Sequence, residues 1–85
     1  MELKKRRREL DCIDFKIVSL LEKRKKKILQ MGKIKNLHRI QIVQKEREKE
    51  LVKNLINRVD IEPNVIKKIY NILFRYSYQL QRRKR

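Results

Sequence analysis

The chain has 85 residues, with one glycine, one proline and a formal net charge of +16. This length makes one small domain, residues 1–85, and the composition excludes a β-rich fold and predicts an all-helical one. The charge predicts an anionic ligand. Three classes of ligand fit this prediction: nucleic acid, an acidic membrane surface and a small polyanion. The lone Cys12 and the lack of a long apolar run predict a cytoplasmic protein that does not enter the membrane.

The first predicted helix spans 2–36 and carries cations within its apolar stripe. Its apolar residues recur at intervals of three, four and seven, the period of an amphipathic helix: Leu3, Leu10, Ile13, Ile17, Leu20, Leu21, Ile28 and Met31. Arg24 and Lys35 lie on that stripe, and Arg7 borders it. A buried cation is costly unless it meets an anion. The cations therefore indicate either an anionic ligand or acidic partner, or side chains that reach past the stripe to solvent.

The length of this helix predicts a dimer. At 1.5 Å per residue the helix should be roughly 50 Å long. Two shorter helices of an 85-residue chain cannot cover an apolar stripe of that length. We therefore expect a second copy of the chain to cover the rest.

Two further helices follow a connection predicted at 37–43, in which His38 needs no function. The second helix is predicted over 44–59, on the stripe Leu51, Val52, Leu55, Ile56 and Val59. The third is predicted over 63–82, because Pro63 preceded by acidic residues is typical of a helix start. Its stripe is Ile66, Ile69, Tyr70, Leu73 and Leu80.

Polar residues interrupt these two stripes at helical spacing. Gln44 and Glu48 precede Leu51 and Leu55 on one side of the second helix, with Arg47 beside them, and Ser77 and Gln81 follow Leu73 at intervals of four. All three helices therefore bring polar groups toward the core. The simplest occupant of such an interior is a small, oxygen-rich dianion.

Spaced motifs along the chain resemble those of the all-helical chorismate mutases of the AroQ type. The first helix holds Arg7, Ile13-Asp14, Leu20-Leu21, Arg24, Gly32-Lys33 and Lys35; the second holds Arg47-Glu48; the third holds Ser77 and Gln81. The resemblance covers essentially the whole chain without a gap. It implies a single-domain, intertwined helical homodimer that rearranges chorismate to prephenate in the biosynthesis of phenylalanine and tyrosine, with no cofactor and no metal.

The resemblance also implies roles for the cations. Arg24 and the other subunit's Arg7 would hold the two carboxylates of chorismate, because a guanidinium matches a carboxylate with two hydrogen bonds. Lys35 and Gln81 would meet the ether oxygen, which gains negative charge as its bond to carbon breaks. The reaction is pericyclic, so positioning and electrostatics would supply the catalysis.

The remaining site residues would serve the ring hydroxyl and a carboxylate. By resemblance, Glu48 accepts from the ring hydroxyl, with the backbone around Arg47 assisting, and Ser77 supports a carboxylate. Gln44 departs from the family pattern, because some members carry an aspartate there. An amide can still form a hydrogen bond at that position, so the departure concerns the placement of the hydroxyl.

Two other functions fit parts of the sequence. A basic helical module that binds nucleic acid would explain the lysine and arginine clusters, with Tyr70, Tyr76 and Tyr78 available to stack on bases. No DNA-binding motif with its turn chemistry is visible, however. A structural coiled-coil dimer would explain the apolar stripes but would favour apolar residues at Arg24 and Lys35.

Overall fold

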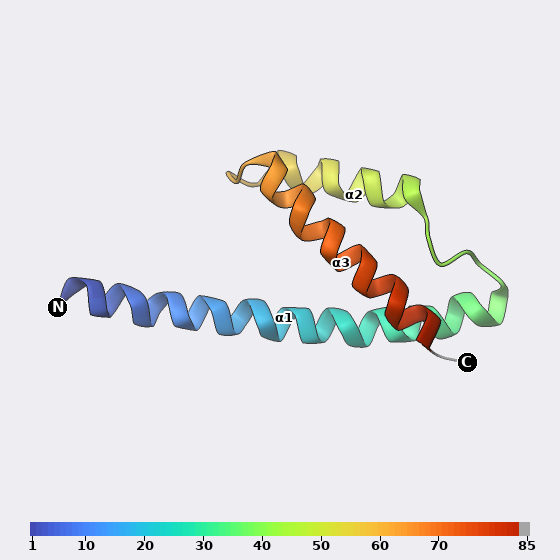
Figure 1. Cartoon of the computed structure of the whole chain (residues 1–85), viewed down its shortest axis with the longest axis horizontal. Coiled ribbons are helices and arrows are strands. Elements are labelled where there is room, and N and C mark those ends of the chain that lie inside the picture. Colours follow the sequence, from blue (N-terminus) through green and yellow to red (C-terminus); the bar gives the residue numbers. More distant parts are fainter. Residues whose placement is uncertain (84–85) are drawn as a thin grey trace.

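The computed structural model describes residues 1–83 as three α-helices, α1 (Glu2–His38), α2 (Lys45–Arg58) and α3 (Pro63–Arg83) (Figure 1). The described residues include no strand. The predicted all-helical fold of three helices is therefore confirmed, with helix ends within two residues of those expected. Lys84 and Arg85 lie outside the described residues.

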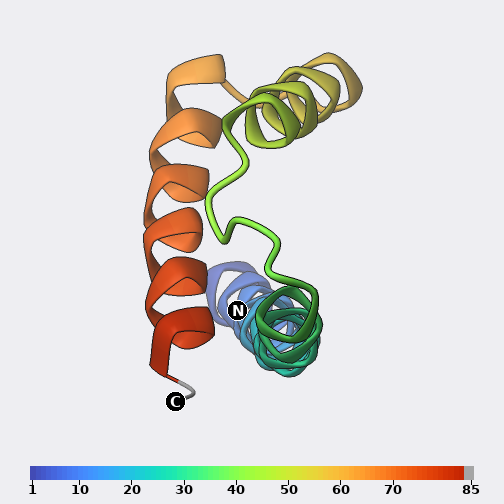
Figure 2. The same cartoon turned by 90° about the vertical axis from the view of Figure 1, so that its right-hand side faces the viewer.

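The three helices form an open arrangement rather than a closed bundle. Helix α3 crosses the C-terminal half of α1, and α2 packs on α3, while the N-terminal part of α1 projects alone (Figures 1 and 2). The longest dimension is 56 Å and the radius of gyration is 16.1 Å. A compact chain of this length would have a radius of gyration of about 12 Å. The single chain is therefore far from globular.

The buried core of one chain is correspondingly small. The apolar side chains buried in it are Ile28, Ile66 and Leu80. Most of the apolar stripe predicted in the first helix is exposed, including Leu3, Leu10, Ile13, Ile17 and Leu20. Each large apolar side chain contributes about 1.5–3 kcal/mol when it is fully buried. Much of the apolar surface that the sequence offers therefore remains uncovered within one chain.

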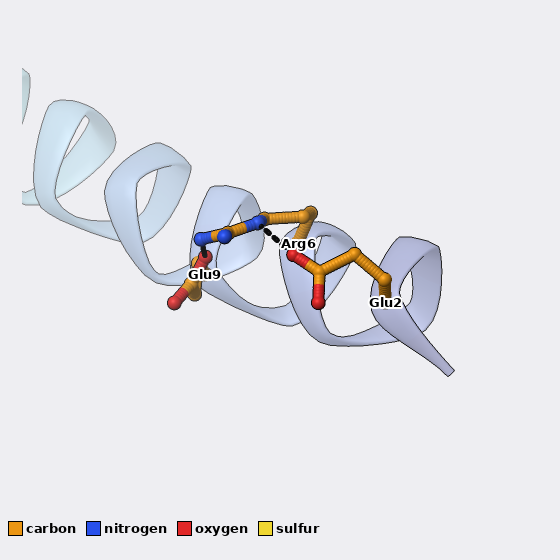
Figure 3. Close-up of polar contacts among 3 residues, drawn as sticks. All are labelled: Glu2, Arg6 and Glu9. Carbon is orange, nitrogen blue, oxygen red and sulfur yellow. Dashed lines mark hydrogen bonds and ion pairs between the residues drawn. The ribbon is translucent and has the colours of Figure 1, made fainter.

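The exposed start of α1 is held by local ion pairs. Arg6 contacts the Glu2 carboxylate at 2.7 Å and the Glu9 carboxylate at 3.0 Å, one turn away on either side (Figure 3). Such exposed pairs each contribute about 0.3–0.5 kcal/mol to a helix. Arg7 is exposed and forms no ion pair within residues 1–83.

Helix α1 ends two residues later than the sequence suggested. Leu37 and His38 were predicted in the connection, but both are helical, and the chain turns at Arg39. Arg39 adopts the left-handed conformation with φ 58° and ψ 39°, and the amide of Ile40 donates to the carbonyl of Lys35 at 2.8 Å. This cap satisfies a free carbonyl of the last turn. Residues 39–44 then lead back toward α2 (Figure 2).

Candidate active site

A pocket of about 280 Å³ lies among the three helices and the connection before α2. Its polar lining residues are Arg24, Lys27, Lys35, Gln44, Arg47, Glu48, Ser77, Tyr78 and Gln81, and its apolar ones are Ile28, Met31, Ile42, Leu51 and Phe74. Pockets for drug-sized ligands measure roughly 300–1,000 Å³, so this pocket is just smaller than that range. This volume therefore suits a small molecule.

Arg24 enters the pocket from α1 and is anchored by α3. Its Nη1 donates to Ser77 Oγ at 2.7 Å, and Ser77 Oγ donates in turn to the carbonyl of Leu73 at 2.8 Å. Ser77 is buried, with 4 % of its surface exposed. The hydroxyl thus fixes one end of the guanidinium and leaves four of its five N–H donors for other acceptors.

Lys35 is the most buried cation of the pocket. Its side chain is on the last turns of α1, the residue is 8 % exposed, and Nζ donates to the carbonyl of Ile42 at 3.0 Å. Burial lowers the pKa of Lys35 below its ordinary value, and attraction to Glu48 partly offsets that effect. An ammonium group in this environment gains more from a nearby negative charge than one in water would.

Glu48 faces Lys35 across the pocket from the first turn of α2. Its Oε2 accepts a hydrogen bond of 2.5 Å from the Tyr78 hydroxyl of α3. Burial and this contact with Glu48 raise the pKa of Tyr78 to about 12. Tyr78 therefore remains protonated, and a donor, at neutral pH.

Gln81 lies against α1 at a close approach of α1 and α3. Its Nε2 donates to the carbonyl of Ser77 at 3.2 Å, whereas its buried Oε1 has no hydrogen-bond partner among the described residues. The approach depends on Gly32, because a Cβ at that position would meet Gln81 Cα at 3.1 Å. The amide thus retains one N–H donor and an unpaired acceptor.

Seven of the eight site residues predicted from the sequence line this one pocket: Arg24, Lys35, Gln44, Arg47, Glu48, Ser77 and Gln81. The eighth, Arg7, does not. It precedes Arg24 by 17 residues on the same helix, which places it about 25 Å away along the axis. No arginine side chain spans that distance, so Arg7 cannot reach the pocket of its own chain.

The family model described as chorismate mutase type II matches residues 6–82. The chain belongs to this family. The matched segment contains all eight predicted site residues, Arg7 to Gln81. No curated protein and no solved structure was found to match the chain.

Two polar residues of this chorismate mutase type II chain were missed as pocket residues. Lys27 and Tyr78 both line the pocket, and helical spacing could have identified them. Lys27 lies three residues after Arg24, and Tyr78 lies three before Gln81, so each shares a face with a predicted site residue. The sequence alone indicates Tyr78 only as a surface on which a base could stack.

The pocket of this chorismate mutase family member is strongly cationic. Arg24, Lys27, Lys35 and Arg47 carry positive charge, and Glu48 carries the single negative charge among its lining residues. An oxygen-rich dianion would be attracted by the cations, and Glu48 would accept from a hydroxyl on it.

A larger cavity of about 550 Å³ lies along α2 and α3 and shares only Glu48 and Phe74 with the smaller pocket. Its lining includes four lysines, Lys45, Lys49, Lys53 and Lys67, over the apolar side chains of Val52, Ile56 and Phe74. It lacks the residues of α1 altogether. The larger cavity therefore reflects an uncovered face of α2 and α3. The smaller pocket, by contrast, is lined by polar side chains from all three helices.

The described residues, 1–83, offer no long apolar helix of the kind that crosses a bilayer.

Proposed function

We propose that this chain is a chorismate mutase that rearranges chorismate to prephenate in the biosynthesis of phenylalanine and tyrosine. The observation that carries the proposal is the convergence of Arg24, Lys35, Glu48 and Gln81 on one small cationic pocket. These four residues come from three helices and are separated by up to 57 positions in sequence. Membership of the chorismate mutase type II family supports the same reaction.

The proposed catalysis begins with the two carboxylates of chorismate. Arg24 holds one of them with the N–H donors that Ser77 leaves free, and the other subunit's Arg7 holds the second. Clamping both ends favours the compact conformer in which the two reacting carbons meet. The enzyme thereby reduces the entropic part of the barrier before any bond changes.

Lys35 and Gln81 act on the bond that breaks. In the rearrangement the carbon–oxygen ether bond breaks as a carbon–carbon bond forms, and the ether oxygen gains negative charge. The buried Lys35 ammonium and the remaining Nε2 hydrogen of Gln81 donate to that oxygen. Donors placed in advance stabilise the transition state more than the ground state, since the charge on the oxygen is larger there.

The ring hydroxyl is bound at the start of α2. Glu48 accepts its hydrogen bond, and the backbone around Arg47 and the amide of Gln44, two further pocket-lining residues, assist. The N-terminus of α2 adds positive potential at this end of the pocket. This end therefore recognises the hydroxyl, whereas Arg24 and the other subunit's Arg7 recognise the carboxylates.

The site is completed in an intertwined homodimer. Two uncovered surfaces support this arrangement: the exposed apolar stripe of the N-terminal half of α1, and the apolar floor of the α2–α3 cavity. Placing α1 of one chain against α2 and α3 of the other would cover both surfaces and would deliver Arg7 to the second pocket.

The first test follows the loss of the ultraviolet absorbance of chorismate and the appearance of prephenate. Arg24→Ala should lose activity while keeping its helical circular dichroism. Lys26→Ala is the matched control, because it removes a cation two residues away on the exposed side of α1. No turnover by the folded wild-type protein, or equal rates in Arg24→Ala and Lys26→Ala, would refute the proposal. In the first case, binding to nucleic acid at physiological salt would be measured next.

A second test asks whether Arg7 acts across the dimer. Arg7→Ala and Arg24→Ala are each expected to be inactive, but after the two are unfolded and refolded together, the mixed dimer regains one intact site. Random pairing should restore about a quarter of the wild-type activity. If Arg7 acted within its own chain, or had no part in the site, mixing would restore nothing beyond the average of the two variants.

A further inference from the structure

Tyr78 and Glu48 form a hydrogen bond that joins α3 to α2 at the wall of the pocket. The donor is the Tyr78 hydroxyl, the acceptor is Glu48 Oε2, and the distance is 2.5 Å. Both residues are partly buried, and both line the pocket. The described residues provide no hydrogen-bond donor to the other carboxylate oxygen, Oε1.

We propose that Tyr78 is a positioning residue that fixes the Glu48 carboxylate with Oε2 occupied and Oε1 available to a hydroxyl of the ligand. This inference rests on the proposed function for the identity of that ligand. An ionised carboxylate only accepts hydrogen bonds. The Tyr78–Glu48 pair therefore selects a ligand that donates at this point, such as the ring hydroxyl of chorismate, over one that presents a ketone or an ether there.

The Tyr78 ring contacts Arg82, and the Tyr78 hydroxyl keeps its proton. The guanidinium carbon of Arg82 lies 5.9 Å from the centre of the Tyr78 ring, within the range of a cation–π contact. The pKa of Tyr78 is raised to about 12 by burial and by Glu48, so the hydroxyl keeps its proton across the neutral range. The hydroxyl consequently remains a donor to Glu48 until the pH approaches 12.

Tyr78 also keeps Glu48 away from Lys35. Glu48 attracts Lys35 across the pocket, yet no ion pair between them forms in the described part of the chain. Lys35 is buried and held by the carbonyl of Ile42, so a Glu48 side chain freed from Tyr78 would move toward the ammonium. Such a pair would occupy the cation proposed to meet the ether oxygen. Tyr78 therefore preserves both the hydroxyl acceptor and the charge on Lys35.

The test compares Tyr78→Phe with Tyr76→Phe in the chorismate assay. Each variant removes one hydroxyl from α3, but Tyr76 does not line the pocket. Tyr78→Phe should lower kcat/KM about tenfold, the usual size of effect when a hydrogen bond to a charged group is lost. It should also move the alkaline limb of the pH profile to higher pH, because Lys35 paired with Glu48 holds its proton more tightly. Tyr76→Phe should change neither.

These two readouts separate positioning from a structural effect. A loss of kcat/KM without movement of the alkaline limb would mean that the substitution disturbs packing, and would overturn the proposal. A Tyr78→Phe variant within twofold of Tyr76→Phe would overturn it as well.

A third readout needs no ligand and covers the case in which the variant folds poorly. In the alkaline ultraviolet titration of the wild-type protein, one tyrosine should ionise at about pH 12. That step should disappear in Tyr78→Phe, and it should move to lower pH in Glu48→Gln, because the negative charge is gone. An unmoved step in Glu48→Gln would overturn the pairing. A wild-type protein without turnover would instead refute the proposed function, whereas the titration would still decide whether Tyr78 holds Glu48.

Discussion

Gly32 controls how closely α1 approaches Gln81, and Gly32→Ala tests whether that closeness matters. A Cβ at position 32 would lie 3.1 Å from Gln81 Cα, 3.2 Å from Cγ and 3.3 Å from Cβ, whereas ordinary contacts of this kind begin at 3.4 Å. The nearest atom belongs to the α3 backbone, so the helix itself must move by about 0.3 Å or more.

The expected change in stability is the balance of two effects. Replacing a mid-helix glycine by alanine stabilises a helix by about 1 kcal/mol. Forcing an extra carbon into a tight contact costs about 1–3 kcal/mol. We therefore expect Gly32→Ala to lower the free energy of unfolding by up to about 2 kcal/mol.

The same displacement should reduce activity more clearly than stability. Gln81 is proposed to donate to the ether oxygen, and a misplacement of 1 Å typically costs about a hundredfold in rate. A shift of a few tenths of an ångström therefore predicts a several-fold fall in kcat. Urea unfolding at one protein concentration and the chorismate assay measure the two effects, with Lys33→Ala as the exposed neighbouring control. A Gly32→Ala protein about 1 kcal/mol more stable with unchanged kcat would refute the reasoning.

Four further results are expected. Burial lowers the pKa of Lys35, so kcat/KM should fall as pH rises through a value below 10.5, and Lys35→Arg should remove that fall if it remains active. In the same window the folded chain binds fewer protons than the unfolded one, so this residue's contribution to the free energy of unfolding should increase with pH in urea titrations. Because Gln81 donates without titrating, activity should change little from neutral to mildly acidic pH, and a steep rise at low pH would contradict its role. Arg39→Gly should raise the free energy of unfolding by up to about 1 kcal/mol, because glycine adopts a positive φ without strain; Arg39→Ala, which keeps the strain, should not.

The helices were predictable because their signals are local. Pro63 marks the start of α3, and stripes of period 3.6 identify all three elements. The end of α1 was less predictable, because the left-handed residue there is Arg39. Glycine or asparagine usually marks the end of a helix, and arginine does not. The sequence consequently predicts Leu37 and His38 in the connection, whereas both are helical.

The pocket was predictable to the extent that its residues interrupt apolar stripes. Arg24, Lys35 and Ser77 are polar residues at positions of the apolar stripes, and this departure from the helical pattern can be recognised from the sequence alone. The bond between Tyr78 and Glu48 is not, because it depends on how α2 and α3 are oriented and crosses 30 positions of sequence. A tyrosine on a helix face is also compatible with ordinary packing. The placement of Arg7 in a second pocket stays a prediction.

The connection at 39–44 has a consequence for how this chain can be altered. The carbonyl of Ile42 holds Lys35, and its side chain lines the pocket, so this short loop sets the position of an ammonium group on another element. The turn between α2 and α3, by contrast, is exposed at Asp60, Ile61 and Glu62 and contributes nothing to the pocket. A linker, an epitope tag or new chain ends should therefore be tolerated at 60–62. The same insertion at 40–43 would displace Lys35 from its place in the pocket while leaving every helix intact. Natural variation in loop length should therefore occur at 60–62 and not at 40–43.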